Sequence, residues 1–142
     1  SARYPSTVMV SVVCPWDDHE QLDERAFRHE IDHALKAGFR HVYVFGTAGE
    51  GYGVDTARFR RVIEVFGDEM ARTEGSRAMV GVIGLSTANV VERIGIAHDE
   101  APTSRHEFVR LGEHGLSHQM PRPFSTFNMR GTFHPVISIP LG

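Results

Sequence analysis

Three short apolar segments recur along the first hundred residues, and their even spacing constrains the fold more than any other feature. The segments start near residues 8, 41 and 78. Each is followed by a longer stretch in which apolar residues repeat with the period of a helix. Strands and helices that alternate in this way are typical of parallel strands joined by helical crossovers. The sequence therefore predicts an α/β fold with three successive βα units.

Three helices with one apolar face each are expected from the same periodicity. The first begins after its N-cap Asp23 and ends at Gly38. The second begins after Asp55, and Ser86 or Thr87 opens the third. The residues predicted to face the core are Phe27, Ile31, Ala34 and Leu35 in the first helix, Phe59, Val62, Ile63, Phe66 and Met70 in the second, and Val90, Val91, Ile94 and Ala97 in the third.

The second apolar strand runs directly into a glycine-rich loop, which is the first candidate site. Residues 41–45 are followed by four glycines within the eight residues 46–53. Glycine lets the backbone turn sharply and approach a ligand without an intervening Cβ. Loops at strand ends are also where α/β proteins hold their ligands. The hydroxyl of Thr47 and the amides around it are therefore candidate ligand donors.

This loop does not match the two common nucleotide-binding motifs. Its spacing from Gly46 is G-x-x-G-x-G-x-G, whereas a dinucleotide fingerprint reads G-x-G-x-x-G. A Walker loop needs Gly-Lys-Ser/Thr, and here Tyr52 follows Gly51. We therefore expect no nucleotide cofactor.

The repeating pattern stops after about residue 98. Residues 99–142 contain five of the seven prolines and four of the nine histidines, and no convincing strand appears where a fourth unit is due. We therefore expect two parts. Residues 1–98 form the βα units, and residues 99–142 form a divergent or poorly structured segment. An irregular but folded subdomain is the alternative. A shifted reading frame and a genuinely divergent terminus would give the same pattern.

Composition narrows the classes of partner. A net charge of −3 gives no electrostatic reason to expect nucleic acid or an anionic membrane as a partner. No apolar stretch approaches the roughly 20 residues needed to span a bilayer. The first residues lack the apolar segment of a signal peptide, and the single cysteine, Cys14, can form no internal disulfide. These features favour a cytoplasmic protein.

A second candidate site is the first predicted helix, where His29, Glu30 and His33 match the H-E-x-x-H pattern of zinc hydrolases. At about 100° per residue, both histidines fall opposite the apolar face of the helix, where solvent is expected. A solvated helix face is therefore the simpler interpretation, and a zinc hydrolase is kept as an alternative. A third ligand could come from His106, His114 or His118.

Four features occur in a recognisable order along residues 22–88. They are the helix at 22–38, the loop Gly46-Thr-Ala-Gly-Glu50, the helix segment 60–65, and the strand 80–84 followed by Ser86-Thr-Ala. In these features the chain resembles the dihydrodipicolinate synthase and N-acetylneuraminate lyase family of pyruvate-dependent class I aldolases. Members of that family are (β/α)₈ TIM barrels of about twice this length. The resemblance implies the first three βα units of such a barrel, with an irregular C-terminal segment.

The resemblance also implies a chemistry for the glycine-rich loop. Members of the family are lyases that form a Schiff base with a 2-oxo acid such as pyruvate, and their loop binds its carboxylate. By resemblance, Thr47 binds that carboxylate and joins a proton relay, which makes it the candidate catalytic residue. Gly46, Ala48, Gly49 and Glu50 complete the candidate substrate-binding loop, with Ala48 at a position where a second hydroxyl is frequent. No metal or other cofactor is implied.

The Schiff-base lysine of the family has no counterpart in these residues. The single lysine, Lys36, falls at the end of the first helix, on the outside of the implied barrel. The tyrosines Tyr4, Tyr43 and Tyr52 match no relay position. We therefore expect a truncated lyase without its catalytic lysine, and whether the chain is an enzyme stays open. A non-catalytic barrel fragment is the alternative, and the open edges of such a fragment predict a homo-oligomer.

Overall fold

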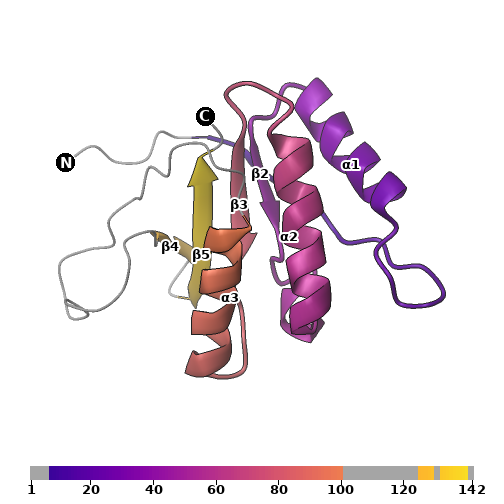
Figure 1. The fold of residues 1–142 in the computed structure, drawn as a ribbon. Helices are drawn as coiled ribbons and strands as arrows, with labels where there is room; N and C mark the ends of the chain where they lie inside the picture. Colours follow the sequence, from indigo (N-terminus) through magenta and orange to yellow (C-terminus); the bar gives the residue numbers. More distant parts are fainter. Residues whose placement is uncertain (1–6, 101–124, 130–131, 141–142) are drawn as a thin grey trace, which may run out of the picture.

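The computed structural model describes residues 7–100, 125–129 and 132–140 of the 142-residue chain. The strands form one five-stranded sheet in the order β1-β2-β3-β5-β4, and the helices α1, α2 and α3 lie on the same side of it (Figure 1). None of the helices in these described ranges is long and apolar enough to cross a membrane. The elements are β1 (Met9–Ser11), α1 (Glu24–Lys36), β2 (His41–Val44), η1 (Gly51–Gly53), α2 (Thr56–Met70), β3 (Arg77–Gly81), α3 (Thr87–Asp99), β4 (Ser125–Met129) and β5 (Thr132–Pro140).

The first three strands are parallel, as the spacing of the apolar segments predicts. β1 pairs with β2 in the register Met9↔His41, and β2 pairs with β3 in the register His41↔Arg77. A helix connects each strand to the next, and α3 follows β3. This arrangement confirms the predicted α/β class with a parallel three-stranded sheet.

The sheet departs from the βα repeat beyond β3. β5 pairs with β3 in the antiparallel direction, with Ala78 opposite Ile139, and β4 pairs antiparallel with β5. The prolines of residues 99–142 argue against a regular element, yet β-branched residues at 136, 137 and 139 favour a strand. A parallel partner needs a long crossover, whereas β4 precedes β5 by a short connection that suits an antiparallel pair. Residues 101–124, which carry the rest of that prediction, lie outside the described residues.

The helix starts agree with the capping residues predicted from the sequence. Asp23 accepts a hydrogen bond from the N–H of Ala26, and Asp55 accepts one from Arg58. Ser86, rather than Thr87, caps α3, because its hydroxyl accepts the N–H of Asn89. These side chains satisfy N–H groups that the first helical turn leaves unpaired.

One face of the parallel sheet packs against the helices. Val42 and Val44 of β2 are fully buried on this face, whereas His41 and Tyr43 alternate onto the other face and are half-buried. α2 lies between α1 and α3 in this layer (Figure 1). The resulting core contains the predicted apolar face of α2 and, from α1, Phe27, Ile31 and Leu35. From α3 it contains Ile96 and Ala97, with Val90 and Ile94 packed against it. The prediction that Val91 faces the core is wrong, because Val91 is 44% exposed.

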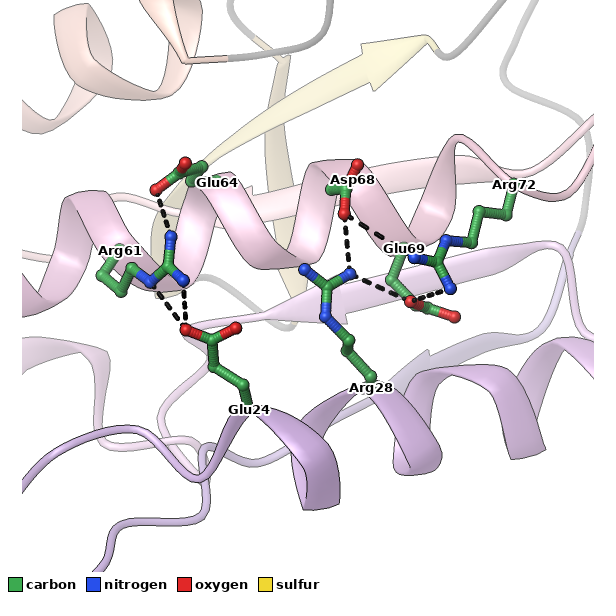
Figure 2. A network of polar contacts seen from close by, with 7 residues as sticks. All are labelled: Glu24, Arg28, Arg61, Glu64, Asp68, Glu69 and Arg72. Atoms are coloured by element: carbon green, nitrogen blue, oxygen red, sulfur yellow. Dashed lines mark hydrogen bonds and ion pairs between the residues drawn. The ribbon is translucent and has the colours of Figure 1, made fainter.

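A network of ion pairs joins α1 to α2 along their exposed side (Figure 2). Arg28 of α1 donates to Asp68 at 2.8 Å and to Glu69 at 3.1 Å. Glu69 is only 6% exposed and also pairs with Arg72, at 3.2 Å. Arg61 bridges Glu24 of α1 and Glu64 of its own helix. Because Glu69 is buried, its partners are the part of the network that matters most for stability.

We expect Arg28→Met to lower the free energy of unfolding by about 1–2 kcal/mol, because it removes one of two cations from a buried carboxylate. Urea denaturation followed by circular dichroism measures the change. Arg25→Met is the matched control, since Arg25 is exposed on the same helix and makes no ion pair in the described part of the chain. Equal stabilities of the two variants would contradict the prediction.

Candidate functional site

The glycine-rich loop lies at the carboxyl end of the parallel strands. It begins at Phe45, directly after β2, and reaches the start of η1 at Gly51. A Cβ atom added to Gly49 would lie 3.4 Å from the carbonyl oxygen of Val12, next to β1. A Cβ atom added to Gly81, the last residue of β3, would overlap the carbonyl of Phe45. The loop therefore lies across the ends of all three parallel strands.

The turn out of β2 is made by Phe45 in a left-handed conformation, with φ of 63°. This conformation is unfavourable for a bulky residue and persists only where the surroundings hold it. Here the Phe45 side chain is fully buried and its ring stacks on that of Phe59, with centroids 4.8 Å apart. The Phe45 carbonyl fits only because Gly81 and Gly51 have no side chains. Packing thus holds the strained turn that starts the loop.

We expect Gly81→Ala to lower the free energy of unfolding by at least about 2 kcal/mol, because its Cβ would collide with backbone that cannot move freely. Gly95→Ala is the control, since position 95 is in the interior of α3 and has nothing within 4 Å of an added Cβ. That control is expected to gain about 0.5–1 kcal/mol from helix propensity. A stable Gly81→Ala protein in a urea titration would show that the contact is not constraining.

Two neighbouring backbone N–H groups in the loop are available to a ligand. The N–H groups of Gly49 and Glu50 are used within the loop, donating to the carbonyls of Gly46 at 3.1 Å and Thr47 at 3.2 Å. Thr47 and Ala48 are exposed, and within residues 7–100 neither their N–H groups nor the Thr47 hydroxyl has an acceptor. Successive amide donors in a turn can bind an anion.

The five predicted site residues therefore have three different placements. Thr47 and Ala48 present donors at the surface, whereas Gly46 and Gly49 are buried and shape the turn. Glu50 is exposed in a left-handed conformation with φ of 52°, and its carbonyl accepts the N–H of Gly53. The structure brings these residues together in one loop. Substrate binding by them stays a prediction.

A buried arginine beneath the loop was not identified from the sequence. Arg93 of α3 is 3% exposed and donates hydrogen bonds to the carbonyls of Gly51, Val54 and Ile83. Its guanidinium carbon lies 4.9 Å from the centroid of the Phe59 ring. Burial lowers the pKa of Arg93, with the charge of Glu92 acting in the opposite direction. The guanidinium nevertheless stays charged, as arginine does in proteins.

A signal for Arg93 is present in the sequence. The predicted apolar face of α3 contains Val90, Val91, Ile94 and Ala97. Arg93 lies on the side of Val90 and Ala97, three residues after the first and four before the second. An arginine in an apolar stripe has to find acceptors inside the protein. Which acceptors it finds depends on the tertiary structure.

Among the lysine and the tyrosines of the described residues, Tyr43 is the one in a β-strand beside the glycine-rich loop. Lys36 is the last residue of α1 and lies near the amino end of β2, whereas the loop follows the carboxyl end of β2. Its ammonium group pairs with Asp32 at 2.7 Å. This hydrogen bond raises the pKa of Lys36. Tyr43 lies beside the loop, with its ring against Gly46, and burial raises the pKa of its phenol. Tyr52 is exposed in η1, and Tyr4 lies outside the described residues.

The zinc-binding pattern on α1 faces solvent, as its helical position predicts. His29 and His33 are exposed and their rings stack at 6.2 Å. Glu30 accepts a hydrogen bond from the N–H of Val13 at 3.1 Å. Within the described ranges, no group of three metal-ligating side chains is present. The proposed third ligands, His106, His114 and His118, lie outside those ranges.

Cys14 is placed as a core residue rather than as a nucleophile. Its side chain is buried, and burial, with a further contribution from the charge of Glu30, raises the pKa of the thiol to about 12. A nucleophilic cysteine needs the opposite shift.

Because the thiol is buried and protonated, we expect native protein at pH 8 to resist iodoacetamide over hours, and protein unfolded in urea to add one carbamidomethyl group. Mass spectrometry of both samples makes the comparison. Equally fast labelling of native and unfolded protein would mean that Cys14 is accessible.

A small pocket of about 120 Å³ lies next to the start of α2. Both of its cations already have carboxylate partners, since Arg58 pairs with Asp55 and Arg61 pairs with Glu24. The pocket therefore offers an acidic ligand less than the exposed amides of Thr47 and Ala48 do. Its lining residues are Trp16, Gln21, Leu22, Ala57, Arg58 and Arg61.

Comparison with protein families gives one match that spans most of the described chain. The model of the dihydrodipicolinate synthetase family matches residues 4–94. A curated relative, 4-hydroxy-tetrahydrodipicolinate synthase of Oceanobacillus iheyensis, is 42% identical over 43 residues. That alignment covers 30% of this chain and 15% of the relative.

Solved structures show the same fold at low sequence identity. Dihydrodipicolinate synthase from Aquifex aeolicus is 21% identical with a TM-score of 0.60, and its match covers 66% of this chain and 31% of that one. YagE, a prophage protein of the dihydrodipicolinic acid synthase family from E. coli K12, was solved in complex with pyruvate. It is 19% identical with a TM-score of 0.61, over 66% of this chain and 30% of that one. The chain thus matches about a third of the length of these structures, and its α/β fold is similar to that part of their barrel.

Proposed function

Because the chain belongs to the dihydrodipicolinate synthetase family, we propose that residues 46–50 bind the carboxylate of a pyruvate-type 2-oxo acid. One observation carries this proposal. The N–H groups of Thr47 and Ala48 and the Thr47 hydroxyl lie at the carboxyl ends of the parallel strands. They are exposed and have no acceptors in the described part of the chain. The pyruvate complex of the related YagE supports the choice of ligand.

The donors suit a carboxylate for a simple electrostatic reason. A carboxylate has two oxygens with several lone pairs, and it accepts hydrogen bonds from fixed N–H groups without a large reorganisation. Thr47 adds a third donor and is our proposed catalytic residue, since its hydroxyl can also pass a proton to a bound substrate. Gly46, Gly49 and Glu50 hold the backbone of the loop in place around it.

Schiff-base chemistry would need an amine that these residues do not place near the loop. A lysine forms an iminium with a 2-oxo acid, which is a better electron sink than the ketone. The single lysine of the chain, Lys36, pairs with Asp32 near the amino ends of the parallel strands, away from the loop. We therefore propose that these residues form the carboxylate-binding part of a Schiff-base lyase and do not form the Schiff base themselves.

The position of Lys36 also favours a second candidate function, a non-catalytic barrel fragment that binds or assembles without turnover. Residues 1–98 would then represent the first three βα units of a barrel. In the described residues, β1 is an outer strand of the sheet and has one unpaired edge. Such an edge supports the proposal of a homo-oligomer, and the composition supports a cytoplasmic location.

Titration of the protein with pyruvate, followed by the amide signals of the loop in heteronuclear NMR spectra, tests the proposed site. We expect Thr47→Val to raise the dissociation constant about tenfold, because one hydrogen bond to a charged group is lost. Thr47→Ser should keep most of the affinity. Thr73→Val is the control, since Thr73 lies between α2 and β3, at the opposite edge. No response of Thr47 and Ala48 to pyruvate in the unmodified protein would refute the site.

Borohydride reduction in the presence of pyruvate separates binding from catalysis. A Schiff base would be trapped as a stable amine and would increase the mass of the protein. We expect pyruvate to bind and the mass to stay unchanged. An adduct on Lys36 would overturn the proposal that these residues do not form the Schiff base.

A further inference from the structure

We propose that Arg93 is a positioning residue that holds both ends of the loop at 46–50 and so orients its free N–H groups. The inference rests on the proposed function for its link to substrate, whereas its structural part stands on the contacts of Arg93 alone. Those contacts connect α3 to two different βα loops. Gly51 is the first residue of η1, Val54 directly follows η1, and Ile83 is the second residue after β3.

Arg93 holds the far end of the loop directly. Its guanidinium donates to the carbonyl of Gly51, the residue that follows Glu50. The N–H of the same Gly51 points back to the carbonyl of Gly46 at 3.5 Å. The peptide units around Gly51 are therefore tied to the helix on one side and to the start of the loop on the other.

The near end of the loop is held through an aromatic ring. The guanidinium of Arg93 lies over the ring of Phe59, and the ring of Phe45 stacks on the same Phe59 at 15°. Phe45 is the residue whose left-handed conformation turns the chain out of β2. Arg93, Phe59 and Phe45 thus form one stack, and Thr47 and Ala48 lie between the two points that the stack and the guanidinium fix.

A purely stabilising role explains this arrangement poorly. Arg93 has no carboxylate partner in the described part of the chain, and its Nε–H is buried without an acceptor there. A buried charge with an unsatisfied donor contributes little net stability, and an apolar side chain of similar volume often does as well. What an apolar side chain cannot do is bring three carbonyl groups toward one point, since their dipoles need a shared donor. The geometry therefore points to loop positioning.

The charge and the shape of the side chain can be separated by two variants. Arg93→Met keeps an unbranched apolar stem, is somewhat smaller, and loses every side-chain donor. Arg93→Lys keeps the charge but loses the planar fork that reaches several acceptors at once. Val91→Met is the matched control, because Val91 is exposed on the same helix and receives the same new side chain. Heteronuclear NMR spectra, hydrogen exchange of the loop amides and pyruvate titration are measured on all four proteins.

We expect Arg93→Met to shift the amide signals of residues 45–54 and to speed their hydrogen exchange, while signals from α1 and the Val91→Met spectrum stay unchanged. The dissociation constant for pyruvate should rise about tenfold or more, because misplaced donors lose alignment. Arg93→Lys should recover part of both effects. Loop signals of Arg93→Met that superpose on those of the unmodified protein would overturn the inference.

Two further outcomes also decide the matter. If Arg93→Met unfolds, Arg93→Lys becomes the test, and loop shifts in a folded Arg93→Lys protein support positioning, whereas its global unfolding would assign Arg93 to general stability. If the unmodified protein does not bind pyruvate, the proposed function fails. The loop signals and exchange rates of the variants still test Arg93 in that case, so the two failures are distinguishable.

Discussion

The buried guanidinium of Arg93 is the interaction on which the candidate site depends. It joins α3 to the loop after β2 and to the end of β3, and it lies over Phe59 in the core. A charge in this place has to be compensated by dipoles, and three backbone carbonyls do so. Because those carbonyls lie at the start of η1, directly after η1 and two residues after β3, the same contacts that satisfy the charge also define where the connections after β2 and β3 lie.

The rest of the scaffold makes this arrangement possible. Parallel pairing brings the ends of β1, β2 and β3 to one edge, and the ion pairs around Glu69 join α1 to α2 on the outside. The strained backbone at Phe45 is tolerated because its ring is stacked and its carbonyl meets glycines. A rigid frame of this kind can keep N–H groups unpaired at the surface, which is the property that a carboxylate site needs.

Family membership and the geometry of residues 46–50 both favour a carboxylate site in the loop, whereas the described residues place no lysine amine beside it. The match over residues 4–94 identifies the family, while the solved relatives share the fold over about a third of their own length. Within the described residues, Lys36 lies near the amino ends of the parallel strands, whereas the exposed N–H groups of Thr47 and Ala48 lie at the carboxyl ends. In the proposed function, the described residues supply the carboxylate-binding part of a site, and a Schiff base would need a further amine.

Local periodicity and residue chemistry by themselves determined the three βα units, the N-caps Asp23 and Asp55, the solvent-facing histidines of α1 and the candidate loop, because each depends on neighbours close in sequence. The antiparallel pairing of β5 with β3 needed tertiary information, since the sheet edge that accepts a strand is not a local property. The left-handed turn at Phe45, the exposure of Thr47 and Ala48, and the burial of Arg93 were likewise decided by contacts between distant segments. Arg93 shows the division most clearly, because the apolar stripe marks it as unusual while only the folded chain supplies its three carbonyl partners.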